Sequence, residues 1–156
     1  KVSNIGTWNV QTLFKAGKLN NVIHEMDRMR INCLRLQEVR WPGAGDFYKD
    51  KKRVFYSGME KEHNYSVGLI LDSHLSKAVL SFWPKSDRIL LVKLKASPFN
   101  VNIIVVYAPT AEAEDIDIEN LYNFLDEVYT YCKSTEITIV MGDWNAKLGS
   151  EEQGKV

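Results

Sequence analysis

Residues 138–145 read Thr-Ile-Val-Met-Gly-Asp-Trp-Asn, a short apolar run that ends in a glycine, a carboxylate and an amide. The apolar part, 138–142, predicts a strand. Before it, residues 115–133 carry apolar side chains at helical spacing, and residues 101–107 form a strongly apolar strand of the kind buried on both faces. A strand, a helix and a strand in succession predict a parallel strand pair joined by a crossover helix.

The N-terminal part of the chain repeats this order, with a strand at 3–10, a helix at 18–30 and a strand at 31–39. The middle of the chain predicts β-meanders, with strands at 53–57, 66–71, 77–83 and 88–95. Turn-rich sequences separate the strands, at 41–46, 72–74, 84–87 and 97–100. This pattern predicts a single mixed α/β layered domain.

The composition of the 156-residue chain, 45% hydrophobic and 26% charged, is that of a folded domain. No apolar run approaches the roughly 20 residues that cross a bilayer, and the N-terminus lacks a signal peptide. The formal net charge of zero neither supports nor excludes nucleic acid as a partner. The basic cluster at 49–53 is best interpreted as a solvated loop. Cys33 and Cys132 lack the spacing of a zinc motif, which favours reduced core thiols of an intracellular protein.

Polar side chains stand where the strands of both strand-helix-strand units end. These residues are Asn9, Glu38, Tyr107, Asp143 and Asn145. The carboxyl ends of parallel strands share one edge of a sheet, where ligands usually bind. Each residue alone has an ordinary alternative, because strand-end carboxylates often cap turns and tyrosines often lie in cores. Together, carboxylate and amide oxygens without His or Cys suit a hard cation such as Mg²⁺, and a hard cation beside Asn and Tyr suits a phosphate diester.

Four motifs resemble those of the endonuclease/exonuclease/phosphatase superfamily: Thr-Trp-Asn-Val at 7–10, Leu-Gln-Glu-Val at 36–39, Val-Tyr-Ala-Pro at 106–109 and Met-Gly-Asp-Trp-Asn-Ala at 141–146. Longer matches are similar to the endonuclease domain of non-LTR (LINE-type) retrotransposons and to the related family of craniofacial development protein 2-like proteins. These matches are Gln-Glu-Val-Arg-Trp-Pro-Gly at 37–43, Ser-Asp-Arg-Ile at 86–89 and the segment 99–110.

The resemblance implies a DNase I-like fold, a layered β-sandwich of two sheets flanked by helices. It also implies a Mg²⁺- or Mn²⁺-dependent hydrolase that nicks double-stranded DNA, leaves a 3′-hydroxyl and works in the nucleus. Glu38 would bind the metal, with Asn9 beside it. Tyr107 would contact the scissile phosphate or the attacking water, Asp143 would orient and deprotonate that water, and Asn145 would donate to a phosphoryl oxygen.

Arg88 and His74 each have two possible roles. Arg88 opens a strand and is assigned here to substrate phosphate, although pairing with Asp87 is the more ordinary role of such a residue. His74, in Asp-Ser-His at 72–74, superficially resembles a motif that the superfamily places near its C-terminus. Its early position indicates a turn rather than a catalytic histidine.

The superfamily completes its site with strands that follow the Gly-Asp-x-Asn motif and bring a further Asp and a Ser-Asp-His motif. Residues 1–156 carry no such segment. The resemblance therefore implies a C-terminally truncated domain that ends just after its motif at 142–145. We expect this 156-residue chain to be a weak or inactive nuclease.

Two alternative functions stay open at this point. One is another branch of the superfamily: an abasic-site nuclease, a deadenylase or a lipid phosphodiesterase. The other is a domesticated, non-catalytic interaction module. Metal binding discriminates the module from the enzymes, and a substrate panel separates the enzymes from one another.

Overall fold

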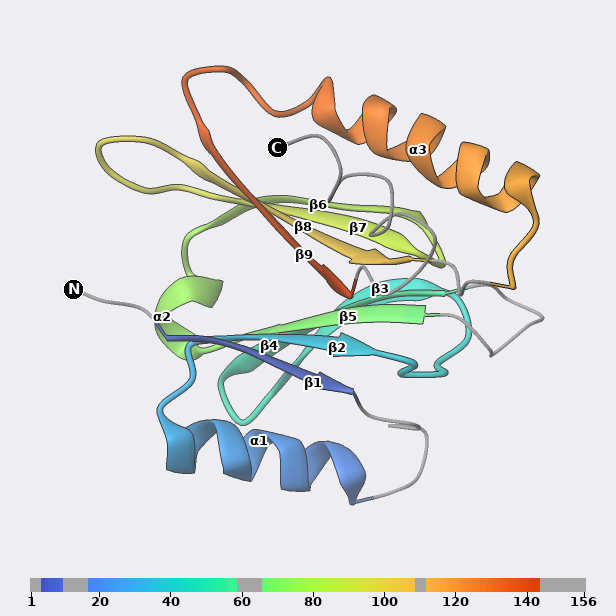
Figure 1. Cartoon of the computed structure of the whole chain (residues 1–156). Coiled ribbons are helices and arrows are strands. Elements are labelled where there is room, and N and C mark those ends of the chain that lie inside the picture. Colours follow the sequence, from blue (N-terminus) through green and yellow to red (C-terminus); the bar gives the residue numbers. More distant parts are fainter. Residues whose placement is uncertain (1–3, 10–16, 59–65, 109–111, 144–156) are drawn as a thin grey trace, which may run out of the picture.

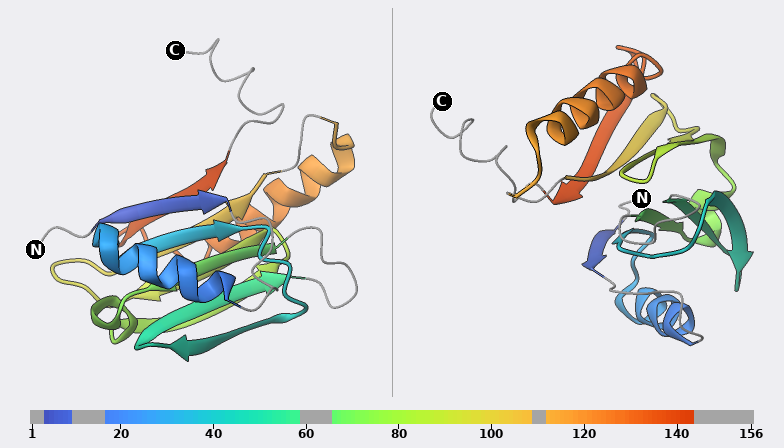
Figure 2. Two further views of the ribbon diagram at one scale, coloured as in Figure 1. Left: turned by 90° about the horizontal axis from the view of Figure 1, so that it is seen from below. Right: turned by 90° about the vertical axis from the view of Figure 1, so that its right-hand side faces the viewer.

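The computed structural model describes four stretches of the chain, residues 4–9, 17–58, 66–108 and 112–143. At the ends of two strands it places the backbone alone, for Trp8, Asn9 and Asp143. Two β-sheets lie face to face, and a long helix covers the outer face of each (Figure 1). Figure 2 shows the same four layers from two other directions.

Sheet A has the strand order β1-β2-β5-β4-β3 within the described residues. Its strands are β1 (Ile5–Asn9), β2 (Cys33–Gln37), β3 (Ala44–Lys49), β4 (Lys52–Gly58) and β5 (Ser66–Leu71). Helix α1 (Lys18–Met29) joins β1 to β2, which are parallel, and the other pairings are antiparallel. The predicted N-terminal strand-helix-strand unit is therefore confirmed.

Sheet B has the order β6-β7-β8-β9 in the part of the chain that the structure describes. Its strands are β6 (Val79–Ser86), β7 (Ile89–Leu94), β8 (Val101–Tyr107) and β9 (Ile137–Asp143). Helix α3 (Asp115–Tyr129) joins the parallel strands β8 and β9. A short helix, α2 (Ser73–Ser76), leads from sheet A to sheet B.

The core between the sheets comes from alternate residues of the central strands. Phe55 and Leu69 of sheet A and Leu90 and Val105 of sheet B are fully buried there. Cys33 belongs to the same core, and burial raises the pKa of its thiol to about 12, so the thiol stays protonated at neutral pH. This core confirms the predicted sandwich of two sheets.

Each long helix buries one apolar stripe against the outer face of its sheet. Val22 and Met26 of α1 pack with Leu34 and Ile70 of sheet A. The stripe on α3 packs on sheet B and consists of Leu121, Leu125 and Val128. Burial of one such side chain stabilises the fold by roughly 1.5–3 kcal/mol. The helical spacing of apolar residues predicted both helices, although α3 ends four residues before the predicted end at 133.

The sequence prediction missed strand β3, which occupies part of the expected loop at 41–46. Two glycines and an aspartate near its start favour a turn locally, and strand pairing overrides that preference. Strand β3 pairs with β4 along its whole length. A tight turn joins the two strands, and its residues Asp50 and Lys51 have φ values of 49° and 66°.

Two predicted turns were also wrong. Strand β6 continues through Pro84 to Ser86 instead of turning at 84–87. A proline is tolerated there because β6 pairs only with β7 within the described residues and the pairing shifts register beside Pro84. The predicted turn at 72–74 is instead the start of α2, where the Asp72 side chain accepts a hydrogen bond from the N–H of Leu75.

The basic cluster at 49–53 lies in the β3–β4 hairpin and is partly neutralised by the protein itself. Lys52 is largely buried and pairs with Asp27 of α1 at 2.6 Å. Arg53 pairs with Asp46 at 2.8 Å. These two cations are therefore paired within the protein, one with helix α1 and one across the β3–β4 hairpin.

The carboxylate of Glu136, just before β9, accepts several hydrogen bonds. Oε1 of Glu136 accepts from Lys93 Nζ at 2.8 Å and from the N–H of Lys133 at 2.9 Å. The amide of Asn102 donates to the same oxygen at 3.3 Å. Chiefly because of Lys93, and next because of Lys133, the pKa of Glu136 falls from 4.5 to about 2. The ionised carboxylate thus ties the entry to β9 to strands β7 and β8.

This lowered pKa makes the stability of the protein depend on pH. Glu136 contributes its full stabilisation above its unfolded pKa of 4.5, and the contribution is lost as pH falls through the folded pKa of about 2. We expect the free energy of unfolding, measured with urea, to fall less steeply from about pH 5 to pH 2 in Glu136→Gln than in the wild type. Glu119→Gln, on the exposed side of α3, should fall as the wild type does. Equal slopes in all three proteins would contradict the assignment.

Candidate active site

The carboxyl ends of both parallel strand pairs carry the residues that the sequence singled out. Asn9, the last residue of β1, pairs in register with Gln37, the residue before Glu38. Tyr107, the last residue of β8, pairs in register with Asp143, the last residue of β9. Each parallel pair therefore brings two of the predicted residues to one strand-end edge.

A hydrogen bond joins these two edges across the sandwich. The hydroxyl of Tyr107 donates to Oε1 of Glu38 at 3.0 Å, although the two residues are 69 positions apart in sequence. Both side chains are partly exposed. The structure thus gathers four predicted residues, Asn9 and Asp143 by their backbones and Glu38 and Tyr107 by direct contact. Asn145 lies outside the described residues.

Arg88, in the turn just before β7, joins the same cluster. Its Nη1 donates to the carbonyl of Tyr107 at 3.4 Å, and its Cζ lies 5.5 Å from the centroid of the Tyr107 ring. The N–H of Tyr107 in turn donates to the carbonyl of Arg88 at 2.8 Å. The guanidinium of Arg88 therefore lies beside the tyrosine whose hydroxyl donates to Glu38.

The segment after β2 holds Glu38 in an uncommon backbone conformation. Glu38 and Arg40 have φ values of 57° and 58°, in the left-handed region. Val39 between them is fully buried, and Trp41 packs edge-on against Phe47 at 5.4 Å between ring centroids. The sequence gives no signal for this conformation, since neither left-handed residue is a glycine.

The donors at this edge fit a small hard cation. Glu38 offers a carboxylate on a fixed backbone, and Asn9 ends the neighbouring strand. Mg²⁺ typically takes one or two carboxylates and keeps several of its waters. Among the described residues no three His, Cys, Asp or Glu side chains group closely enough to hold a metal by themselves. Of the described side chains at this edge, Glu38 is the carboxylate that could bind such an ion.

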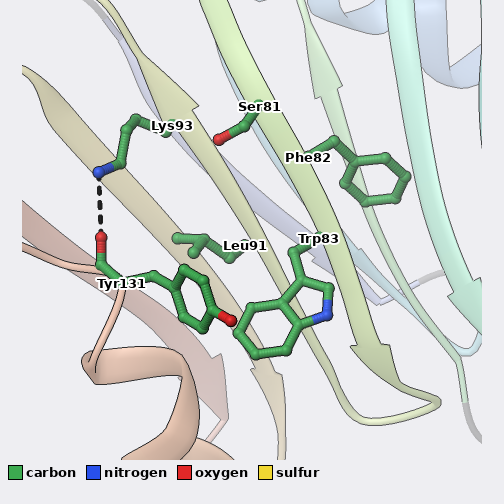
Figure 3. Close-up of a pocket in the computed structure, with 6 residues that line it drawn as sticks. All are labelled: Ser81, Phe82, Trp83, Leu91, Lys93 and Tyr131. Carbon is green, nitrogen blue, oxygen red and sulfur yellow. Dashed lines mark hydrogen bonds between the residues drawn. The ribbon is translucent and has the colours of Figure 1, made fainter.

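A separate hollow lies on the outer face of sheet B, beside the end of α3 (Figure 3). It has a volume of about 350 Å³ and is lined by Ser81, Phe82, Trp83, Leu91, Lys93 and Tyr131. The Trp83 and Tyr131 rings meet edge-on with centroids 4.5 Å apart. None of the predicted site residues lines this hollow, so it is not part of the strand-end cluster.

His74, which the sequence indicated was not catalytic, lies at the end of sheet A opposite Glu38. His74 belongs to α2, which follows Leu71, and Leu71 pairs with Cys33 at the start of β2. Glu38 follows the opposite end of β2. The structure thus keeps His74 away from the cluster.

In the described residues no helix is long and apolar enough to cross a membrane.

Comparison with known sequences places the chain beside a vertebrate protein. No family model matches it. It is 35% identical over 148 residues to craniofacial development protein 2 of Bos taurus, an alignment of 95% of this chain with 25% of that protein. The same protein of Tragulus javanicus is 34% identical, with 95% and 26% aligned. The chain spans about a quarter of the length of these curated relatives.

Solved structures show the fold. The endonuclease domain of TRAS1, a telomere-specific non-LTR retrotransposon, superposes with a TM-score of 0.65 at 16% identity, over 94% of this chain and 60% of that one. The 3′ phosphatase NExo from Neisseria, bound to a product DNA hairpin, gives 0.65 at 19%, over 92% and 58%. An endonuclease/exonuclease/phosphatase family protein from Leptotrichia buccalis gives 0.61 at 13%, over 92% and 67%.

These findings confirm the resemblance drawn from the motifs at 7–10, 36–39, 106–109 and 141–146. The structural neighbours are nucleases and phosphatases. The chain has the DNase I-like fold of the endonuclease/exonuclease/phosphatase superfamily, and in sequence it is a relative of craniofacial development protein 2.

Proposed function

We propose that this chain contains the metal-binding and phosphate-binding front portion of a Mg²⁺-dependent phosphodiesterase that nicks double-stranded DNA. The observation that carries the proposal is the hydrogen bond from Tyr107 to Glu38, which brings the ends of β2 and β8 together. A carboxylate, a phenol and the guanidinium of Arg88 then share one small region. That set suits a metal-bound phosphate diester.

In this proposal Glu38 is the metal ligand, and Asn9 helps to position the metal or the phosphate. Bound Mg²⁺ or Mn²⁺ would polarise a phosphoryl oxygen and offset the negative charge that develops during hydrolysis. The Tyr107 hydroxyl orients the Glu38 carboxylate, and it would contact the scissile phosphate or the attacking water.

The remaining residues handle the water and the phosphate. Asp143 takes a proton from the attacking water while the water oxygen bonds to phosphorus. The bond from phosphorus to the 3′ oxygen breaks, and that oxygen takes a proton from solvent water and leaves as a 3′-hydroxyl. Asn145 donates to a phosphoryl oxygen and Arg88 pairs with the phosphate charge, so both stabilise the transition state more than the ground state.

DNA is the proposed substrate because of the longer motifs at 37–43 and 99–110 and because of the TRAS1 endonuclease domain among the structural neighbours. NExo and a TDP2 from D. rerio are structures with DNA products bound. A neutral chain is compatible with an enzyme that holds DNA only during turnover. The proposed place of action is the nucleus.

A substrate panel tests this assignment. Supercoiled plasmid, a duplex with an abasic site, polyadenylated RNA and a phosphoinositide are each incubated with Mg²⁺. Because the chain spans about a quarter of its curated relatives, both the 156-residue chain and a longer protein that carries it are assayed. We expect plasmid nicking, faster with the longer protein.

Other outcomes of the panel decide between the alternatives. Preferred hydrolysis of the abasic duplex, the RNA or the lipid moves the protein to that branch of the superfamily. If a folded protein binds no metal and cleaves none of the four substrates, the enzyme proposal fails, and the non-catalytic interaction module becomes the better description.

A further inference from the structure

The metal-ligand candidate Glu38 belongs to a strained segment, residues 38–40. Glu38 and Arg40 both adopt left-handed backbone conformations, with φ of 57° and 58°. For residues other than glycine such a conformation is sterically unfavourable. Strain of this kind persists only where the surroundings enforce it, and it concentrates at functional sites. The contacts that enforce it here therefore bear on the function of Glu38.

Both ends of the segment are held by one residue, Ser66, the first residue of β5. The carbonyl of Ser66 accepts the N–H of Glu38 at 2.8 Å. The Oγ of Ser66 accepts the N–H of Arg40 at 2.7 Å. Ser66 is fully buried, so water does not compete for either bond.

The residue between the two bonds is fixed by packing. Val39 is fully buried and lies over Gly68, where a Cβ added to the glycine would meet Cγ1 of Val39 at 3.2 Å. Val39 thus occupies the space that a side chain at 68 would take. With its ends bonded to Ser66 and its middle packed on β5, the segment has little freedom, and the Glu38 carboxylate meets the Tyr107 hydroxyl.

The two bonds differ in what they need from the sequence. The carbonyl bond to Glu38 is available from any residue at position 66, whereas the bond to Arg40 requires a side-chain hydroxyl. Without that hydroxyl, the N–H of Arg40 loses its partner and residues 39–40 are free to relax toward ordinary backbone angles. Such a relaxation moves the Glu38 carboxylate, although nothing that touches metal or substrate has been removed.

We propose that Ser66 is a positioning residue, whose hydroxyl locks residues 38–40 in the conformation that presents the Glu38 carboxylate to the metal ion. This inference rests on the proposed metal-dependent function. Residues that hold a metal ligand in position typically change metal affinity or activity by about 10- to 100-fold. Loss of the Ser66 hydroxyl should therefore lower the affinity for the metal.

The test measures Mn²⁺ binding to the 156-residue chain by calorimetry, without DNA. We expect Ser66→Ala to weaken Mn²⁺ binding by about tenfold. The matched control is Ser76→Ala, which removes another buried hydroxyl, one that donates to the carbonyl of Ser73 in α2 at 3.1 Å. Ser76→Ala should leave Mn²⁺ binding within about twofold of the wild type.

The outcomes separate this inference from the proposed function. If the wild type binds Mn²⁺ through Glu38 and Ser66→Ala binds equally well, the positioning role is overturned and the function stands. If both serine variants weaken binding alike, general loss of stability is the cause and the positioning role is again overturned. If the wild type binds no Mn²⁺, or Glu38→Gln binds as the wild type does, the proposed function itself fails.

A second measurement needs no substitution and holds even if Ser66→Ala does not fold. Amide hydrogen exchange of the wild type should show the Arg40 N–H protected, as the bond to the buried Ser66 Oγ requires, although the side chain of Arg40 is exposed. Exchange of this amide at the rate of an exposed, unbonded amide would overturn the proposal.

Discussion

Replacing Glu38 by glutamine is expected to lower the rate of DNA nicking by about 10³-fold and to abolish measurable Mg²⁺ binding. Glutamine keeps the size of the side chain and an oxygen that can accept the hydrogen bond from Tyr107, which glutamate accepts at 3.0 Å. It lacks the negative charge that a Mg²⁺ ligand of this kind supplies. A loss of nicking rate and of Mg²⁺ binding in Glu38→Gln would therefore result from the missing negative charge and not from altered packing.

The measurement compares nicking rates at saturating Mg²⁺, and Mg²⁺ binding by calorimetry, for a longer protein that carries this chain, as wild type and as Glu38→Gln; the Asp143→Asn variant is made in the same protein. Glu119→Gln is the matched control, because Glu119 is an exposed carboxylate on α3. The control should match the wild type in both assays. Retention of Mg²⁺ binding by Glu38→Gln within about threefold would remove Glu38 from the metal site.

Replacing Asp143 by asparagine should lower kcat for nicking by about 10⁴-fold while Mg²⁺ binding changes by less than about threefold. Asparagine at the end of β9 can still hold a water by hydrogen bonding, but it cannot take the proton that the water gives up. The contrast with Glu38→Gln separates the metal ligand from the base.

The control for this variant is Asp117→Asn, on the exposed surface of α3. The rates are measured across pH, because loss of a general base also flattens the limb of the profile that reports its ionisation. An Asp143→Asn enzyme with an unchanged kcat, or with a large loss of metal affinity and no loss of kcat, would show that Asp143 is not the base.

Strands buried on both faces were predicted closely from sequence, whereas the edge strand β3 was missed. The ranges predicted for β5 and β8 match the structure because their side chains are buried almost without interruption. Strand β3 was missed because its exposure alternates and its residues include Gly45 and Asp46, which favour turns. Pro84 also favours a turn, yet it lies within β6, where an edge position in sheet B tolerates a proline.

Part of the candidate site also followed from sequence. A polar residue at the carboxyl end of a parallel strand predicts the edge of a site, which is how Asn9, Glu38, Tyr107 and Asp143 were chosen. The sequence could not predict which residue of one sheet touches which residue of the other. The contact of Tyr107 with Glu38 depends on how the two sheets pack.

The contacts that hold the site were likewise not predictable. Ser66 supports residues 38–40 through a carbonyl and a hydroxyl, and a serine at the start of a strand has no distinctive pattern. Arg88 was weighed between phosphate and Asp87, and the structure adds a contact that neither alternative included, with the carbonyl and ring of Tyr107. Both cases depend on the backbone path, which residue types alone do not fix.

The most direct test of the central claim, a metal-dependent phosphodiesterase site at the ends of β2 and β8, is plasmid nicking by a protein that carries this chain. Supercoiled plasmid is incubated with the purified protein in Mg²⁺ and, separately, in EDTA. The account predicts nicked circles in Mg²⁺ and intact supercoils in EDTA. Equal nicking in EDTA, or intact plasmid in Mg²⁺ with a protein shown to be folded, would contradict it.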